Sequence, residues 1–313
     1  MKNFKYTTKS GLKISGKYFI FPQKSEDSLE IDHNFIFIHA FPFDSDMYVH
    51  NFEDSKMIDA LNKISLVKGN IRIFLPDLPG FGKSELFILK PLNLLPYVEI
   101  IEEMVNYFQI QRLILGGCSM GGYIALEYIR NYPELIKGLV LIDTKPDADN
   151  EDQKQNRLNT ITMLEKSSQN FYSNENLISI TLKKLYKRDA EIKSFLETLY
   201  SRVISKNTQR KKVKIANQIL NIMKNQKVLG VIHALNGMTG RNDTSKVLEN
   251  LKINVLILVG ENDTITPPEI AKRMENTVSN ATLAIIPSAG HLSNMENMHE
   301  FNQSLLNWFQ LKF

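Results

Sequence analysis

Five residues, Gly117-Cys118-Ser119-Met120-Gly121, combine a serine with flanking glycines at a spacing that could create a nucleophile. They follow the apolar run Leu113-Ile114-Leu115 and precede a helix-forming stretch, so a strand turns abruptly into a helix at the serine. Glycines two residues to either side keep side chains out of this strained bend. The bend projects the hydroxyl above the sheet, beside the free N–H groups that begin the helix. We therefore expect Ser119 to be a nucleophile rather than part of an ordinary glycine-rich turn.

His291 is the candidate base for this serine. A serine hydroxyl is a poor nucleophile at neutral pH unless a base accepts its proton and an acid orients that base. Of the six histidines, His291 follows the strand-like run Thr282–Ile286 and a turn over residues 287–290. The C-terminal ends of parallel strands share one edge of a sheet, so this position places His291 on the same edge as Ser119.

Two aspartates follow strand-like runs and compete for the role of the orienting acid. Asp263 comes soon after Val255–Val259, and Asp143 directly follows Leu139–Ile142. Asp263 is favoured because it gives the chain order Ser–Asp–His that sites with this kind of serine turn use. Asp143 is then expected to be a turn or capping residue, and Glu261 is the weakest of the three candidates.

Backbone N–H groups are expected to stabilise the oxyanion of a tetrahedral intermediate, which needs two donors. The N–H of Met120, the residue after the nucleophile, is one of them. The N–H of Phe41 is the other, in the loop His39-Ala40-Phe41-Pro42 that follows Phe35–Ile38. The side chains of Met120 and Phe41 are then expected to line the acyl pocket, while His39 braces the loop by hydrogen bonds.

Other chemistries have weaker support. Cys118 adjoins the serine, but the side chain before such a bend points inward, where cysteine behaves as a small apolar residue. Residues 80–84, Gly-Phe-Gly-Lys-Ser, lack the spacing of a phosphate-binding P-loop, and the glycines around the serine do not fit a dinucleotide motif. The histidines and carboxylates show no metal-ligand spacing. We therefore expect a reaction that needs no cofactor and no metal.

Short apolar runs alternate with longer amphipathic stretches around these residues. Near-continuous apolar runs are typical of parallel strands that are covered on both faces. Tyr97–Phe108 and Met120–Tyr132 are long enough for crossover helices. The sequence therefore predicts an α/β fold with a mostly parallel central sheet flanked by helices. The expected strands contain Phe35–Ile38, Ile71–Leu75, Leu113–Leu115, Leu139–Ile142, Val255–Val259 and Thr282–Ile286.

The alternation of strands and helices stops after Asp143. Residues 147–235 contain no buried-strand run, only charged sequence with helical periodicity, and strand-like runs then resume. We therefore expect a core formed by residues 1–145 and 236–313. Residues 146–235 are expected to be inserted between its two parts as a helical cap, or lid.

A basic segment lies within the expected cap. Residues 181–230 hold thirteen Lys and Arg against three Asp and Glu. One interpretation is a solvated helical face, and the other is attraction of anionic substrates or contact with an acidic surface. Apolar residues such as Leu182, Leu185 and Phe195 interleave with the charges, which is typical of a helix laid on an apolar surface and suits a lid over Ser119.

The composition of the 313 residues is that of an ordinary globular protein, with 43% apolar and 23% charged residues. A net charge of +4 is too small to indicate nucleic-acid binding, and one cysteine excludes an internal disulfide. The first twenty residues contain no apolar segment of the signal-peptide kind, and no run approaches the roughly 20 residues of a membrane-spanning helix. We expect a cytoplasmic protein without a membrane span, and the oligomeric state stays open.

Five segments together resemble α/β-hydrolase-fold serine hydrolases, and they run in the order typical of that family. Within the family the chain is most similar to the group of 3-oxoadipate enol-lactone hydrolases and related small esterases, through residues 141–144 and 290–296. The resemblance covers residues 12–145 and 236–313. The five segments are His39-Ala40-Phe41-Pro42, residues 76–84 (Pro-Asp-Leu-Pro-Gly-Phe-Gly-Lys-Ser), the turn at Ser119, Gly260-Glu261-Asn262-Asp263 and Gly290-His291.

The resemblance implies an α/β-hydrolase fold in which Ser119 is the nucleophile, His291 the base and Asp263 the acid. It also implies that the backbone N–H groups of Phe41 and Met120 form the oxyanion hole. The expected activity is hydrolysis of a small-molecule carboxylic ester or lactone through an acyl-enzyme.

One departure is Ala40, which stands where the family usually has glycine, so the family pattern does not fix the placement of the following N–H. The resemblance also implies that haloalkane dehalogenases and epoxide hydrolases of this fold attack with an aspartate. A serine nucleophile therefore argues against both chemistries. Two alternatives stay open. One is a ligand-binding or sensor protein with little turnover. The other is a C–C bond hydrolase or a cofactor-free haloperoxidase-like enzyme that uses the same three side chains.

Overall fold

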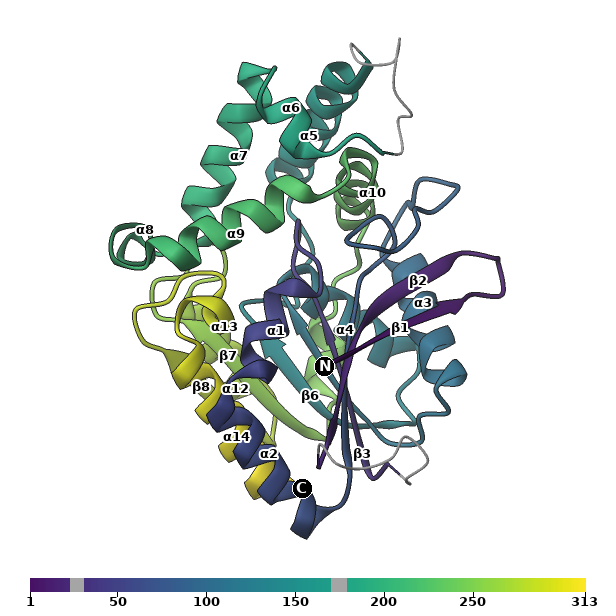
Figure 1. Ribbon diagram of the computed structural model, residues 1–313, viewed down its shortest axis with the longest axis vertical. Helices are drawn as coiled ribbons and strands as arrows, with labels where there is room; N and C mark the ends of the chain where they lie inside the picture. Colours follow the sequence, from purple (N-terminus) through teal and green to yellow (C-terminus); the bar gives the residue numbers. More distant parts are fainter. Residues whose placement is uncertain (23–30, 170–178) are drawn as a thin grey trace.

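An eight-stranded β-sheet runs through the centre of the protein in the computed structural model, which describes residues 1–22, 31–169 and 179–313 (Figure 1). Across the sheet the strand order is β1-β2-β4-β3-β5-β6-β7-β8. β2 is antiparallel to both β1 and β4, and all other neighbouring strands are parallel. The strands are β1 (Lys2–Thr7), β2 (Lys13–Phe21), β3 (His33–Ile38), β4 (Ile71–Pro76), β5 (Leu113–Cys118), β6 (Ile136–Ile142), β7 (Asn254–Gly260) and β8 (Ala281–Ile286).

The six expected apolar runs lie in β3 to β8, so the prediction of a mostly parallel sheet is confirmed. β3 and β5 are buried along their whole length, because helices cover both faces of the sheet at its centre. β1 and β2 were not predicted. β1 alternates exposed and buried residues at the edge of the sheet, and such a one-sided pattern lacks the continuous apolar run by which the other strands are recognised.

Helices form a layer on each face of the sheet (Figure 1). The expected crossover helices at 97–108 and 120–132 correspond to α3 and α4, which pack against each other, with α4 lying on β3, β5 and β6. One layer contains α1 (Asp46–Glu53), α2 (Ser55–Lys68), α13 (Ser293–Glu296) and α14 (Met298–Lys312). The other contains α3 (Leu95–Tyr107), α4 (Met120–Asn131), α11 (Ser245–Glu249) and α12 (Pro268–Thr277).

Six of the seven helices described between β6 and β7 stand together at the top of the view in Figure 1, and the seventh, α11, belongs to the layer of α3, α4 and α12. In the described part of this segment the only extended pairing is an isolated bridge between Thr181 and Lys227. The expected boundary at residue 235 falls inside α10, which packs along α5 and ends at Thr239, and residues 170–178 lie outside the described residues. The six helices are α5 (Glu151–Gln169), α6 (Leu182–Tyr186), α7 (Ala190–Val203), α8 (Lys206–Lys211), α9 (Val213–Asn225) and α10 (Val228–Thr239).

Gly80 and Gly230 let α10 lie directly against the backbone of the loop after β4. A Cβ atom on Gly230 would lie 2.1 Å from the carbonyl oxygen of Gly80, whereas one on Gly237 would lie 3.0 Å from its nearest neighbour. Alanine favours a helix over glycine by about 1 kcal/mol, but overpacking costs ~1–3 kcal/mol. We expect Gly230→Ala to lower the free energy of unfolding in urea by more than Gly237→Ala does. Equal stability of the two variants would contradict this account of the contact.

Candidate active site

Ser119 lies in the abrupt turn between β5 and α4 that its flanking glycines predict. Its backbone has φ 51° and ψ −111°, a left-handed conformation that is strained for a residue with a side chain. A Cβ atom on Gly117 would lie 2.1 Å from the carbonyl oxygen of Gly121, and one on Gly121 would lie 2.2 Å from that of Ile38. The two glycines are therefore required because backbone approaches backbone on both sides of the serine.

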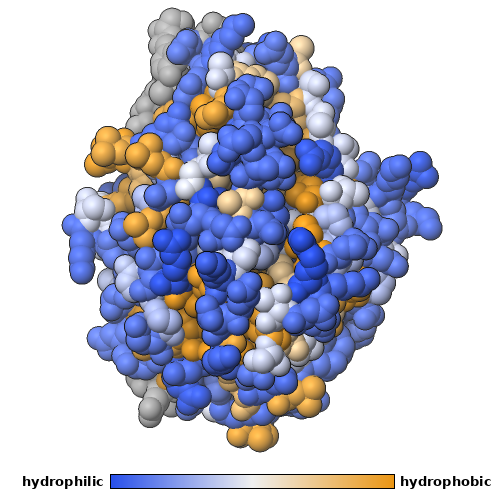
Figure 2. Space-filling view, turned by 180° about the vertical axis from the view of Figure 1, so that it is seen from behind, coloured by the Kyte–Doolittle hydropathy of each residue, from blue (hydrophilic) through white to orange (hydrophobic). Residues whose placement is uncertain are grey.

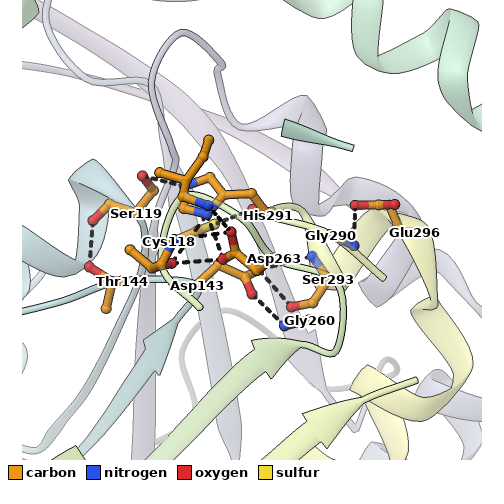
Figure 3. A network of polar contacts seen from close by, with 12 residues as sticks. Cys118, Ser119, Asp143, Thr144, Gly260, Asp263, Gly290, His291, Ser293 and Glu296 are labelled. Carbon is orange, nitrogen blue, oxygen red and sulfur yellow. Dashed lines mark hydrogen bonds and ion pairs between the residues drawn. The ribbon is translucent and has the colours of Figure 1, made fainter. Parts of the chain in front are cut away.

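Three side chains from different loops meet in one chain of hydrogen bonds (Figure 3). His291 Nε2 lies 2.8 Å from Ser119 Oγ, and His291 Nδ1 lies 2.7 Å from Asp263 Oδ2. Asp263 follows β7 and His291 follows β8, so all three residues stand at the C-terminal edge of the sheet. In such an arrangement the imidazole accepts the proton of the hydroxyl while the carboxylate orients the ring.

Asp263 is held in place by the residues that follow it. Its Oδ1 accepts hydrogen bonds from the N–H groups of Ile265 and Thr266, and its Oδ2 accepts one from Thr266 Oγ1 at 2.7 Å. Thr266 Oγ1 is also 3.3 Å from His291 Nδ1. Thr266 was not predicted as a site residue, although an aspartate whose side chain accepts the N–H two residues on is a common turn signal.

The electrostatics of the site favour a charged carboxylate and a basic imidazole. Burial alone would lower the pKa of His291, but the Asp263 carboxylate outweighs burial and raises that pKa above its ordinary value, with smaller contributions from Asp143 and Glu296. Burial alone would raise the pKa of Asp263, but the His291 charge and the hydrogen bonds of His291 and Thr266 hold it below its ordinary range. Each partner thus stabilises the charge that the other carries.

Asp143, the alternative acid, is fully buried, and its hydrogen bonds go to residues other than His291. Its Oδ1 accepts the N–H of Gly260 at 2.8 Å, and its Oδ2 accepts both the N–H and the hydroxyl of Ser293. Burial and the nearby Asp263 raise the pKa of Asp143 to about 7. Asp143 thus joins the end of β7 to the segment after His291, which is more than the turn or cap that the sequence predicts.

Glu261, the third candidate acid, is exposed and accepts the N–H of Ser288 at 2.8 Å. Cys118 is fully buried, as expected for a structural cysteine, with Sγ 4.0 Å from the carbonyl oxygen of His291. Burial raises the pKa of its thiol well above the ordinary value, which opposes formation of a thiolate. Neither side chain is placed to attack a substrate or to orient the imidazole.

The loop after β3 carries the second expected oxyanion donor. The N–H groups of Phe41 and Met120 make no hydrogen bond with another described residue, so both are free to bind a ligand. His39 braces this loop as predicted: its Nδ1 donates to the carbonyl oxygen of Ala40, and its Nε2 accepts the N–H of Leu78. Burial lowers the pKa of His39 to about 4, so the ring stays neutral.

A cavity of about 250 Å³ opens at Ser119 and His291. Phe41 lines it, as expected, but Met120 does not, because the Met120 side chain is fully buried in the core. The apolar part of its wall comes from the loops of the core and from α7 and α10, through Phe195, Leu199, Leu235, Met238 and Ile265. Its charged part is formed by Lys145, Asp149, Arg157 and Arg202. None of these four was predicted as a site residue, although Arg202 belongs to the basic segment of residues 181–230.

A larger cavity, of about 850 Å³, lies along the loop between β4 and α3 and shares no lining residue with the first. This loop exposes three apolar side chains, Ile88, Leu89 and Leu92, of which Ile88 is 92% exposed. The view from behind in Figure 2 shows apolar surface projecting at the upper left of a mainly hydrophilic face. Because the two cavities share no lining residue, the charged residues that line the larger cavity do not line the cavity at Ser119.

Glu296 joins the segment between α7 and α8 to the loop of His291, and Figure 3 shows its contact with Gly290. This fully buried carboxylate accepts the N–H of Gly290 on one oxygen and the N–H of Ser205, between α7 and α8, on the other, both at 2.8 Å. Lys212 Nζ adds a hydrogen bond to the carbonyl oxygen of Glu296 at 2.5 Å. The residue before the imidazole and the start of α8 therefore share one anchor.

Residues 1–22, 31–169 and 179–313 contain neither a cluster of metal ligands nor a helix that could span a membrane. Across these ranges no three His, Cys, Asp or Glu side chains gather in a way that could hold a metal ion. Nor does any helix in these ranges have both the length and the apolar character needed to cross a bilayer.

Known proteins resemble this chain in sequence and in fold. One curated relative is the 2-hydroxy-6-oxononadienedioate/2-hydroxy-6-oxononatrienedioate hydrolase of a Pseudomonas species, 24% identical over 248 residues that cover 79% of this chain and 80% of that protein. A thermophilic esterase from Thermogutta terrifontis, solved with malate bound, has a TM-score of 0.77 and 24% identity, covering 99% of both chains. The enol-lactonase from Burkholderia xenovorans LB400 has a TM-score of 0.72 and 14% identity, covering 98% of this chain and 99% of that one.

At these identities the two solved structures show a shared fold. The sequence profile described as the alpha/beta hydrolase fold matches residues 34–298, which is most of the chain. The matched range includes the turn at Ser119, Asp263 and His291. The chain therefore belongs to the alpha/beta hydrolase fold family of enzymes.

Proposed function

We propose that this protein is a serine hydrolase that cleaves a carboxylic ester or lactone through an acyl-enzyme. The observation that carries the proposal is the hydrogen-bond chain from Ser119 Oγ through both ring nitrogens of His291 to Asp263. The strained backbone of Ser119 supports it, because strain of this kind concentrates at functional sites. We further propose a small-molecule substrate and a cytoplasmic location.

In the proposed reaction, Ser119 Oγ attacks the carbonyl carbon while His291 Nε2 takes its proton. Asp263 keeps a hydrogen on Nδ1 and stabilises the imidazolium, and the N–H groups of Phe41 and Met120 bind the oxyanion. His291 gives the proton to the leaving alkoxide as the C–O bond breaks, which leaves an acyl-enzyme. Water then attacks with the same base, releasing the acid and restoring the serine hydroxyl.

We also propose that the six helices α5 to α10 act as a cap that shapes the pocket. Support comes from the cavity wall, to which α5, α7 and α10 contribute side chains beside Ser119 and His291. Since α10 ends at Thr239, we extend the proposed cap from the expected residues 146–235 to residues 146–239. The core is then formed by the chain before and after this segment.

A panel of 4-nitrophenyl esters of graded acyl length, assayed beside aliphatic lactones, tests the proposed activity. We expect short acyl chains to react fastest, because a cavity of about 250 Å³ lies below the range usual for drug-sized ligands. A fluorophosphonate probe should label the folded protein stoichiometrically at Ser119. Folded protein that resists the probe and hydrolyses no member of the panel would instead support the ligand-binding or sensor alternative.

C–C bond hydrolysis is a second candidate function, favoured by the curated relatives that carry the hydrolase name given above. The same three side chains would serve it, since water or serine would again attack a carbonyl carbon. A 2-hydroxy-6-oxo dienoate added to the panel distinguishes the two activities. Turnover of that compound, with none of the esters or lactones, would replace the ester proposal by this one.

The pH dependence of the reaction follows from the raised pKa of His291. Only the neutral imidazole accepts the serine proton, so activity is present above the pKa of His291 and is lost as the pH falls through it. Because Asp263 raises this pKa, we expect kcat/KM for a neutral ester to fall on the acid side with an apparent pKa above about 6.5, the ordinary histidine value. An acid limb centred clearly below that value would contradict the assignment of His291 as the base.

A further inference from the structure

Positive charge in the cavity at Ser119 exceeds negative charge. Asp149 is the carboxylate of its wall, and two guanidinium groups already bind it. Arg157 Nε lies 2.5 Å from Asp149 Oδ2, and Arg241 Nη2 lies 3.1 Å from Oδ1. The side chains of Asp149 and Arg241 are almost completely buried, so this cluster is a permanent part of the cavity wall. Both oxygens of Asp149 are thus engaged, and two guanidinium charges already outweigh its single negative charge.

Lys145 is one of the two remaining cations that line the cavity. It follows β6, is half-buried, and its Nζ donates to the neutral Gln153 Oε1 at 3.2 Å. An ammonium group has three hydrogens to donate, so this contact leaves capacity for a ligand. Burial, and then Arg241, lower the pKa of Lys145, while Asp149 and Asp147 act in the opposite direction.

Arg202 is the other cation. It lies near the end of α7, in the basic segment of residues 181–230, and no carboxylate among residues 1–22, 31–169 and 179–313 pairs with it. Its planar guanidinium is suited to a carboxylate because two parallel N–H groups match the two oxygens. Lys145 follows β6 of the central sheet, whereas Arg202 lies on α7. The two charges therefore line one cavity from different structural elements.

We propose that the substrate is an anionic ester or lactone, whose carboxylate binds Arg202 and Lys145 while its ester carbonyl lies at Ser119. This inference rests on the proposed hydrolase activity and specifies its substrate class. The small volume favours a carboxylate over the bulkier phosphate, since the same cavity must also hold the acyl chain. Acyl transfer proceeds as described above, and the carboxylate takes no part in bond making or breaking.

Two esters of matched shape test this inference. In mono-4-nitrophenyl glutarate the acyl chain ends in a carboxylate, and in 4-nitrophenyl 5-methylhexanoate an isopropyl group of similar shape replaces it. We expect kcat/KM of the unaltered protein to favour the anionic ester. Arg202→Gln and Lys145→Gln should each lower the anionic-to-neutral ratio of kcat/KM by about ten- to a hundredfold, mainly through KM, because each removes a charge-assisted hydrogen bond.

Lys193→Gln is the matched control, because Lys193 is an exposed cation of α7 that does not line the cavity. We expect this variant to keep the ratio of the unaltered protein. If Arg202→Gln and Lys145→Gln also keep it while both esters are hydrolysed, the anion site is wrong and the proposed hydrolase stands. An equal fall in all three variants would show a general field of the basic segment, and it would overturn the specific site.

A binding measurement separates the anion site from catalysis. Calorimetric titration with glutarate should show binding to the unaltered protein and at least tenfold weaker binding to Arg202→Gln. That result would support the site even if neither ester were hydrolysed, in which case only the proposed activity would fail. Absence of glutarate binding to the unaltered protein, or tighter binding of inorganic phosphate than of glutarate, would overturn the carboxylate assignment.

Discussion

Ser119→Ala is expected to lower kcat for the best ester of the panel by about four to six orders of magnitude. The loss is large because, in the described residues, the Ser119 hydroxyl is the hydrogen-bond partner of His291 Nε2 and alanine has no oxygen to replace it. The backbone contacts of the turn, such as Ser119 N–H to Ile142, do not involve the hydroxyl, so the variant should fold normally. Steady-state kinetics and a thermal melt measure the two properties separately.

Cys118→Ala provides the matched comparison for this prediction, because it removes the neighbouring candidate nucleophile. A buried thiol with a raised pKa contributes packing, so we expect some loss of stability and near-normal kcat. Near-normal ester hydrolysis by Ser119→Ala, or its disappearance in folded Cys118→Ala, would remove Ser119 as the nucleophile.

Asp263→Asn is expected to lower kcat by about 10⁴-fold while the protein stays folded. The N–H groups of Ile265 and Thr266 require an oxygen acceptor at the Oδ1 position, so the new amide nitrogen would face His291 Nδ1. An N–H donor there selects the tautomer whose hydrogen lies on Nε2. That tautomer cannot accept the proton of Ser119, and the imidazolium also loses its counter-charge.

Asp143→Asn tests whether the acid is assigned to the correct aspartate. Its oxygens accept hydrogen bonds from Gly260 and from Ser293, so an amide nitrogen would oppose an N–H donor in either orientation. We expect a loss of about 1–3 kcal/mol in the free energy of unfolding, with kcat of the folded variant reduced less than tenfold. Survival of activity in Asp263→Asn together with its loss in folded Asp143→Asn would reverse the two assignments.

Much of the central sheet follows from local sequence. The runs in β3, β5 and β7 are apolar throughout, because helices cover both faces, and such runs are too short for helices. The turn at Ser119 is also largely local, since a side chain on Gly117 would meet the backbone of Gly121, four residues later. Gly121 is required by the backbone of the neighbouring strand β3. Chain order then favoured Asp263, whose side chain is the one that meets His291.

The walls of the site depend on contacts that no local pattern contains. Lys145 and Arg202 line one cavity although more than fifty positions separate them, and charge counts did not distinguish Arg202 from other cations of α7. The edge strand β1 escaped prediction for a related reason, as its pairing with β2 and not its composition defines it. Tertiary packing determines these features, and propensity does not.

The shared anchor at Glu296 limits what can be learned by deleting the proposed cap. Deletion of residues 146–239 would remove Ser205 and leave one oxygen of the buried Glu296 carboxylate without its hydrogen bond. We expect this to lower the free energy of unfolding by about 1–3 kcal/mol. The other oxygen accepts the N–H of Gly290, directly before His291, so the deletion would also disturb the position of the imidazole. Loss of activity in the truncated protein could therefore result either from displacement of His291 or from loss of the pocket that binds the substrate. Point substitutions at the rim preserve that linkage and give the cleaner comparison.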